Sequence, residues 1–184
     1  MLKKLVEYNK KRNFTKTSEP RGKQEKSSKR LRFVVQHHLA RKDHYDLRLE
    51  WNGVLKSWAV PKGPSYNPKD KRLAVMVEDH PLSYRNFEGT IPKGEYGAGT
   101  VMLWDYGTWK VVGGTKPNFN NGLIKFKLNG KRLKGLWTLV LMNGNNWLLI
   151  KDKDEYHLYD DILEFDTSIK TGKTMAEISE NKAT

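Results

Sequence analysis

Short stretches that alternate polar and apolar residues, separated by glycine-rich turns, make up most of this chain. Between His44 and Trp51 the polar residues share one parity and the apolar residues the other, as in a half-buried strand. Asn52 and Gly53 then give a strong hairpin signal before a second predicted strand at residues 54–60. Further strands are predicted at residues 31–35, 73–78, 100–104, 108–112, 123–128, 136–142 and 147–151. So many short strands indicate a mainly β fold, either a barrel or a sandwich.

The two ends of the chain have a different pattern. Residues 21–30 are a polar run, rich in Lys and Ser and without an apolar side chain, which is typical of a mobile segment. We therefore expect a basic amino-terminal arm at residues 1–30 and a single β domain at residues 31–184. Residues 166–184 resemble a short helix followed by a frayed tail.

Composition narrows the choice of partner. The chain carries 34 Lys and Arg against 21 Asp and Glu, a formal net charge of +13, which favours a polyanion and nucleic acid before an anionic membrane. The absence of cysteine excludes disulfides and thiolate metal sites. No apolar run approaches the ~20 residues that span a bilayer, and the amino terminus lacks the apolar segment of a secretion signal. We therefore expect a cytoplasmic protein that does not bind membranes.

The candidate chemistry begins with His38, His44 and Asp46. On a strand, residues two apart have Cα atoms ~6.5 Å from each other, so His44 and Asp46 can converge on one ion. His38, arriving from the preceding turn, would complete a set of two histidines and one carboxylate that takes Mn, Fe or Zn. Arg48 shares the same face and is suited to gripping phosphate. The alternative is a solvated polar face with incidental histidines.

A second polar group surrounds the predicted strand at residues 73–78. Arg72, Glu78 and His80 have one parity, so we expect them to share a face. Glu78 would then hold a ligand histidine and His80 would contact phosphate or transfer a proton. Lys62, in a proline-flanked turn, would bind phosphate as a point charge. The alternatives are a surface ion pair, a loop histidine and a solvated lysine.

Taken together, these motifs closely resemble one family, the 3′-phosphoesterase domain of bacterial and archaeal DNA ligase D. The resemblance runs from about residue 8 to about residue 180 and rests on many separate motifs in the right order. They lie at residues 33–38, 44–50, 53–64, 71–75, 77–82 and 87–101. Because 184 residues leave no room for a ligase or polymerase domain, we expect a stand-alone version or an excised domain.

The resemblance implies a compact antiparallel β-barrel that removes 3′-terminal ribonucleotides and 3′-phosphates at primer–template ends with Mn²⁺, or with Co²⁺ or Zn²⁺. It implies an end-joining role beside a DNA ligase, as a monomer. The metal ligands it implies are His38, His44 and Asp46, and the phosphate contacts are Arg48 and His80. Further active-site positions by resemblance are Lys62, Arg72, Glu78, Tyr84, Arg12 and Glu19.

One departure from the family weakens this assignment in the arm, because Asn13 stands where the family commonly has Asp. The alternative function is accordingly a non-catalytic nucleic-acid-binding barrel with a structural or vestigial metal site. In either case we expect the arm and Lys125, Lys127, Lys131 and Lys134 to hold the nucleic-acid backbone.

Overall fold

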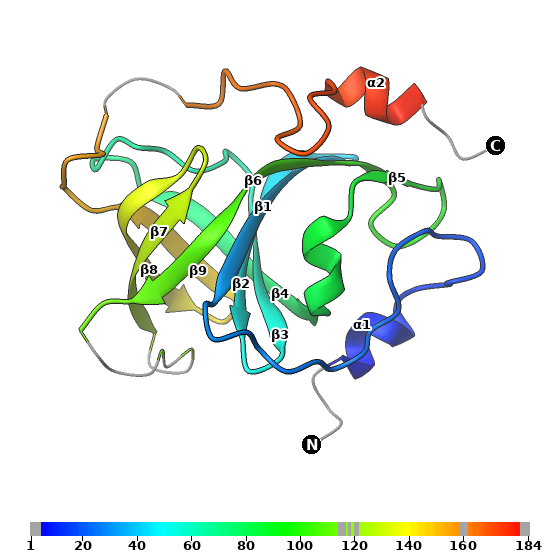
Figure 1. Cartoon of the computed structure of the whole chain (residues 1–184), viewed down its shortest axis with the longest axis horizontal. Helices are drawn as coiled ribbons and strands as arrows, with labels where there is room; N and C mark the ends of the chain where they lie inside the picture. The colour runs from blue at the N-terminus through cyan, green and yellow to red at the C-terminus, as the bar shows by residue number, and fades with distance from the viewer. Residues whose placement is uncertain (1–4, 114–116, 118, 120–121, 159–161, 181–184) are drawn as a thin grey trace.

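Antiparallel strands closed into a barrel form the body of the protein (Figure 1). The computed structural model describes residues 5–113, 117, 119, 122–158 and 162–180. Going round the barrel, the strand order is β1-β2-β3-β4-β9-β8-β7-β6, and β6 pairs again with β1 to close it. The strands are β1 (Arg32–Leu39), β2 (Asp43–Trp51), β3 (Val54–Val60), β4 (Arg72–His80), β6 (Gly99–Val111), β7 (Leu123–Gly130), β8 (Lys134–Asn143) and β9 (Asn146–Lys151). The predicted β-barrel is therefore confirmed.

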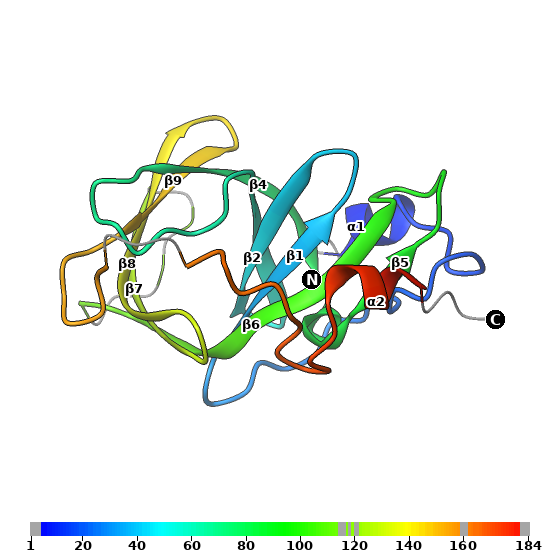
Figure 2. The same cartoon turned by 90° about the horizontal axis from the view of Figure 1, so that it is seen from above.

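Short elements lie outside the barrel at one end of the molecule. Strand β5 (Gly89–Ile91) pairs with β6, and a 3-10 helix η1 (Leu82–Asn86) precedes it. The α-helices α1 (Val6–Lys10) and α2 (Met175–Glu180) lie near β5, whereas β7, β8 and β9 occupy the opposite end (Figure 2). None of the described helices has the length and apolar character needed to cross a membrane.

Apolar side chains pack in two separate clusters, one on each side of the barrel wall. The larger cluster fills the barrel and includes Tyr45, Leu47 and Leu49 from β2. The smaller one lies outside the wall, where Tyr8 of α1 and Tyr84 of η1 pack with neighbours from β3, β5 and β6. Because side chains alternate along a strand, the polar residues of β2 face the outer side. The outer wall of β1, β2, β3 and β4 is therefore a covered polar surface.

Two predicted strands prove to be one. Residues 100–104 and 108–112 were expected as separate strands, yet β6 runs from Gly99 to Val111. Gly107 does not break it: a Cβ there would come within 2.1 Å of the Asn129 carbonyl oxygen, so the glycine allows β7 to approach closely. β1 is also longer than expected, because it continues through His38 to Leu39.

The amino-terminal arm contains no helix or strand between Lys11 and Leu31, but it follows a path fixed by hydrogen bonds. Glu50, fully buried on β2, accepts from the backbone amides of Ser28 at 2.9 Å and Arg32 at 3.1 Å. The amide of Gly53, in the β2–β3 turn, donates to Ser27 Oγ at 2.8 Å. The arm is thus held against the end of the β2–β3 hairpin.

This arrangement leads to a test of how the arm is held. We expect Glu50→Ala to lower the free energy of unfolding by about 1–3 kcal/mol, because two backbone donors lose their acceptor. Trypsin should then cut faster after Lys29 and Arg30, which mass spectrometry will locate. Glu25→Ala, which removes an exposed carboxylate from the same arm, is the control. Equal cleavage of Glu50→Ala and the unmodified protein would contradict the role of Glu50.

Candidate functional site

His38, His44 and Asp46 meet on the outer wall of the barrel. His38 of β1 and His44 of β2 are direct partners across the strand pair, and Asp46 follows on the same face of β2. The Nδ1 atom of His38 lies 3.7 Å from Asp46 Oδ2, and the Nε2 atom of His44 lies 3.6 Å from Asp46 Oδ1. One donor atom from each residue falls within 4.8 Å of the others. The three predicted ligands are therefore brought together.

The backbone fixes which ring nitrogen each histidine presents. The Nε2 atom of His38 lies 2.9 Å from the carbonyl oxygen of Gly97, so this nitrogen carries the hydrogen and donates it. The Nδ1 atom of His44 lies 2.9 Å from the carbonyl oxygen of Lys42 and donates likewise. The lone pairs on His38 Nδ1 and His44 Nε2 consequently point toward Asp46. Hydrogen bonds of this kind orient histidine ligands in metal sites, so the donor set fits a divalent transition metal.

Arg48 lies beside this cluster with its guanidinium held on two sides. Its Nε atom donates to Gln36 Oε1 at 2.8 Å, and its Nη2 atom donates to Asp46 Oδ2 at 3.0 Å. Gln36 is itself fixed, because its Nε2 atom donates to the carbonyl oxygens of Tyr84 and Phe87. The third nitrogen of Arg48, Nη1, is buried and has no hydrogen-bond partner among the described residues. A buried donor without a hydrogen-bond partner lowers stability. The Nη1 atom can therefore donate to an anion that enters the pocket.

His80 reaches the same surface from β4. Arg12 Nη2 donates to His80 Nε2 at 3.2 Å, because a guanidinium can only donate. The Nδ1 atom of His80 therefore carries the hydrogen and donates to the carbonyl oxygen of Glu78 at 2.9 Å. Burial, together with the positive charges of Arg48 and Arg12, holds the pKa of His80 well below its usual range. His80 is thus a neutral imidazole whose lone pair faces the arm.

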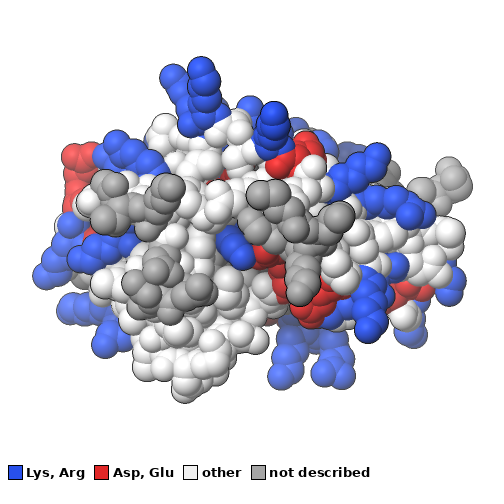
Figure 3. Space-filling view, turned by 90° about the horizontal axis from the view of Figure 1, so that it is seen from below, with Lys and Arg blue, Asp and Glu red and all other residues white. Residues whose placement is uncertain are grey.

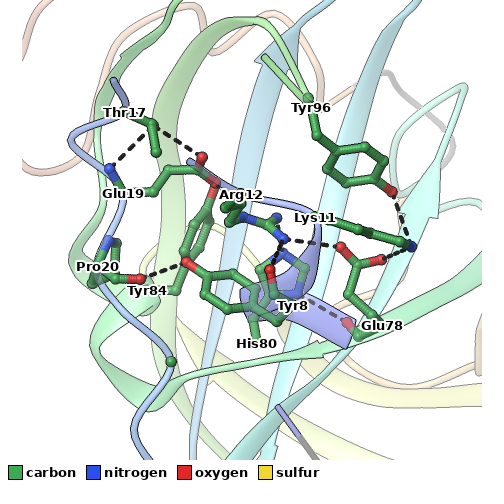
Figure 4. A network of polar contacts seen from close by, with 12 residues as sticks. Tyr8, Lys11, Arg12, Thr17, Glu19, Pro20, Glu78, His80, Tyr84 and Tyr96 are labelled. Atoms are coloured by element: carbon green, nitrogen blue, oxygen red, sulfur yellow. Dashed lines mark hydrogen bonds and ion pairs between the residues drawn. The ribbon is translucent and has the colours of Figure 1, made fainter. Parts of the chain in front are cut away.

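The arm closes over His80 and Tyr84 through a network of buried charges (Figure 4). Arg12 donates to Glu19 at 2.9 Å and to Glu78 at 3.2 Å. Its guanidinium also lies 3.8 Å from the centre of the Tyr8 ring. The hydroxyl of Tyr84 donates to Glu19 Oε1 at 3.0 Å. Arg12 and Glu19 of the arm therefore lie in contact with His80 and Tyr84.

The charge balance keeps the acids of this region ionised. Burial alone would raise the pKa of Asp46, but the positive charge of Arg48 holds it well below the usual range. Burial likewise opposes ionisation of Glu78, yet a hydrogen bond from a backbone amide and one from Lys11 keep its pKa below the ordinary value. Asp46 is thus a carboxylate at neutral pH and can serve as a metal ligand.

Most of the predicted site residues line a single pocket of about 290 Å³. His38, His44, Asp46, Arg48, Glu78, His80, Tyr84 and Arg12 all contribute to its wall. Glu19 does not line it but bonds to Arg12 and Tyr84. Lys62 and Arg72 are not part of the wall, and Arg72 donates to Asp70 at 3.0 Å instead.

An irregularity in β4 explains why Arg72 is separated from Glu78 and His80, with which we expected it to share a face. Leu55 of β3 pairs with His80, but Ser57 pairs with Val77, so β4 holds one extra residue there. Such a bulge reverses the side on which later residues point. Arg72 has the parity of Ala74, which packs inside the barrel.

Sequence reasoning gave no individual role to Gln36, Tyr8 and Tyr96, and it included Lys11 only as part of an arm motif that resembles the family. Gln36 had a usable signal, because it shares the parity of His38 on the same strand. Lys11 binds Glu78 at 3.2 Å, and Tyr96 lines the pocket mouth within 5.4 Å of the Arg12 guanidinium. The partners of Lys11 and Tyr96 lie far away along the chain, so no local sequence pattern indicated these two residues.

Comparison with known proteins gives a consistent result. Residues 36–141 match the family described as the DNA ligase D 3′-phosphoesterase domain. The multifunctional non-homologous end joining protein LigD of Pseudomonas aeruginosa is 49% identical, over 83% of this chain and 19% of its own length. LigD proteins of Mycolicibacterium smegmatis and Mycobacterium tuberculosis are each 42% identical over 83% of this chain, and over 21% and 20% of their own lengths. The chain thus spans about a fifth of the length of these relatives.

The protonation state of His80 can be tested directly. We expect the His80 ring to stay neutral, with the hydrogen on Nδ1, at pH values where a free imidazole is already protonated, near 6.5. Arg12→Met should raise the pKa of His80, because it removes a positive charge and a shielding side chain. Nitrogen-15 NMR of the His80 ring will report both the position of its hydrogen and its pKa. Lys16→Met, which removes an exposed cation of the same arm, should leave His80 unchanged. Titration of His80 near pH 6.5 in the unmodified protein would contradict this assignment.

Proposed function

Because this chain belongs to the DNA ligase D 3′-phosphoesterase family, we propose that it is a metal-dependent hydrolase of DNA 3′ ends. It removes 3′-terminal ribonucleotides and 3′-phosphates from primer–template ends, and so prepares broken DNA for end joining by a DNA ligase. One observation carries the proposal: Arg48, whose buried Nη1 atom has no partner in the described part of the chain, lies beside three side chains suited to a metal. This combination suits a phosphoester, because a metal ion and the guanidinium would both bind oxygens of the same phosphoryl group.

In this proposal His38, His44 and Asp46 hold Mn²⁺, or another transition metal such as Co²⁺ or Zn²⁺. A bound ion of this kind polarises a phosphoryl oxygen and helps to position the attacking nucleophile. The presentation of two imidazole lone pairs toward one carboxylate supports this role for the cluster. Three protein ligands leave coordination positions open for substrate, as catalytic sites require.

The side chains around the cluster have separate tasks. Arg48 donates from Nη1 to a phosphoryl oxygen and stabilises the charge that develops there. His80 orients the phosphate or takes part in proton transfer, and burial beside Arg48 and Arg12 keeps its ring neutral. Arg12, Glu19, Glu78 and Tyr84 position His80 and close the pocket over the phosphate. The resemblance implies active-site positions for Lys62 and Arg72, but neither lines the pocket, so in this proposal they contact nucleic acid outside it.

The competing interpretation is a barrel that binds nucleic acid without catalysis, and its main support was Asn13. The Oδ1 atom of Asn13 accepts from the backbone amide of Thr15 at 3.1 Å and from its hydroxyl at 2.7 Å. An aspartate would accept the same two bonds, and Asn13 does not line the pocket. The substitution therefore gives little reason to prefer the non-catalytic alternative, and we favour the enzyme.

A ligand variant tests the metal assignment. We expect Asp46→Ala to abolish Mn²⁺-dependent shortening of a primer that ends in one ribonucleotide, annealed to a template. The loss removes a ligand from the outer wall and no volume from the barrel core. Asp43→Ala is the matched control, because Asp43 is an exposed carboxylate of the same strand that bonds to His37 outside the cluster. Full activity of Asp46→Ala, at equal folded fraction by circular dichroism, would refute the assignment.

A second variant separates proton transfer from metal binding. We expect His80→Ala to bind Mn²⁺ with near-native affinity in calorimetry, because His80 is outside the ligand cluster. Its saturated rate should fall by about a hundredfold or more, the usual contribution of a positioned acid–base group. A collapse of Mn²⁺ affinity would instead make His80 a ligand, and an unchanged rate would remove it from the mechanism.

A further inference from the structure

A basic groove of about 590 Å³ lies away from the active-site pocket. The end of the arm forms one side of it, and β6, β7 and the start of β8 form the other. Its polar wall carries the cations Lys29, Arg30, Lys110, Lys127 and Lys134, with Tyr156 at its edge. None of the residues lining the pocket around His38 lines this groove.

The cations of the groove have no acidic partner within the described residues. Among the residues that the structure describes, no Asp or Glu lines the groove, and none of the five cations forms an ion pair. Lys110 of β6 and Lys127 of β7 are direct cross-strand partners. Like charges that face each other across two strands repel and cost stability. A polyanion in the groove would remove that cost.

The groove is aligned with the active-site pocket along two neighbouring strands. His38 of β1 pairs with Val101 of β6, and at the other end of the same pairing Arg32 faces Thr108, where the groove begins. From Arg32 to His38 the strand advances six residues, or ~20 Å. This is about the length of six base pairs at 3.4 Å each. Both sites are on the outer wall of the barrel, because the neighbouring Trp109 and Leu128 point into the core.

We infer that this groove binds the phosphate backbone of duplex nucleic acid about one half-turn away from the 3′ end held in the pocket. The choice of ligand rests on the proposed function, which places a primer–template end at His38, Asp46 and Arg48. The groove contributes affinity without reading sequence and sets a minimum duplex length for tight binding. Lys and Arg side chains project at both ends of the lower face of the molecule (Figure 3).

An acidic protein segment is the competing occupant for a groove of this charge. The observation that favours duplex is the distance between the two sites, because a rigid duplex whose 3′ end lies in the pocket is long enough to reach a groove ~20 Å away. An acidic peptide could bind in the groove without any part of it reaching the active-site pocket. The two occupants therefore differ in whether binding depends on the length of a duplex.

The experiment measures binding, without metal and without turnover, so its result does not depend on catalysis. The variant is Lys110→Gln/Lys127→Gln, and the control is Lys71→Gln/Lys173→Gln, which removes the same charge from two exposed lysines outside the groove. Fluorescence anisotropy gives affinities for hairpin duplexes of about five and about sixteen base pairs, across a series of salt concentrations. Removing two phosphate contacts lowers the slope of log K against log salt by about two.

We expect the variant to bind the long duplex at least about tenfold more weakly than the control at 0.1 M salt, a size that follows from two lost contacts. Both proteins should bind the short duplex equally, and the variant should melt no lower than the unmodified protein because a repulsive pair is gone. Equal affinities of variant and control for the long duplex would overturn the inference. It is overturned as well if poly-glutamate competes as well as duplex and duplex length has no effect. If the unmodified protein shows this length dependence but does not shorten a primer in the separate Mn²⁺ assay, the proposed function is refuted and the groove inference is not.

Discussion

The buried guanidinium of Arg48 is the constraint on which the outer wall of the barrel depends. A side chain of this charge, 3% exposed, is tolerated only where its donors meet acceptors. Gln36 and Asp46 supply two of them, and Gln36 in turn holds the backbone of η1 at Tyr84 and of the next residue, Phe87. The same contacts therefore set the position of Asp46, keep it ionised, and hold the segment that carries Tyr84. The remaining donor, Nη1, has no hydrogen-bond partner among the described residues.

The arm turns this polar wall into an enclosed site. Arg12 bonds to Glu19 within the arm and to Glu78 on β4, so the arm brings its own compensating charges when it covers His80. Enclosure has an electrostatic consequence, because charges separated from water interact more strongly. It explains why burial and the two arginines depress the pKa of His80 while the carboxylates nearby stay ionised. A site of this kind suits a reaction in which a neutral base works beside a highly charged phosphoester.

The sequence predicted most of the barrel and the centre of the site, because both depend on local periodicity. The alternation from His44 to Trp51 is enough to place His44, Asp46 and Arg48 on one face, and the structure confirms it. The position of Arg72 could not be predicted, because the bulge in β4 arises from its register with β3. The bond between Arg12 and Glu78 joins residues 66 positions apart, and only the fold brings them together. The family resemblance, not periodicity, indicated that the arm belongs to the site.

The central claim is that the metal ligands and the free donor of Arg48 act on one phosphate group. Phosphorus-31 relaxation of inorganic phosphate in the presence of the Mn²⁺-loaded protein tests it most directly, because the unpaired electrons of Mn²⁺ relax only nearby phosphorus nuclei. The account predicts strong relaxation of bound phosphate in the unmodified protein and a large loss of it in Arg48→Gln, with Mn²⁺ still bound. Equal relaxation in the two proteins, or none in either, would contradict a shared site.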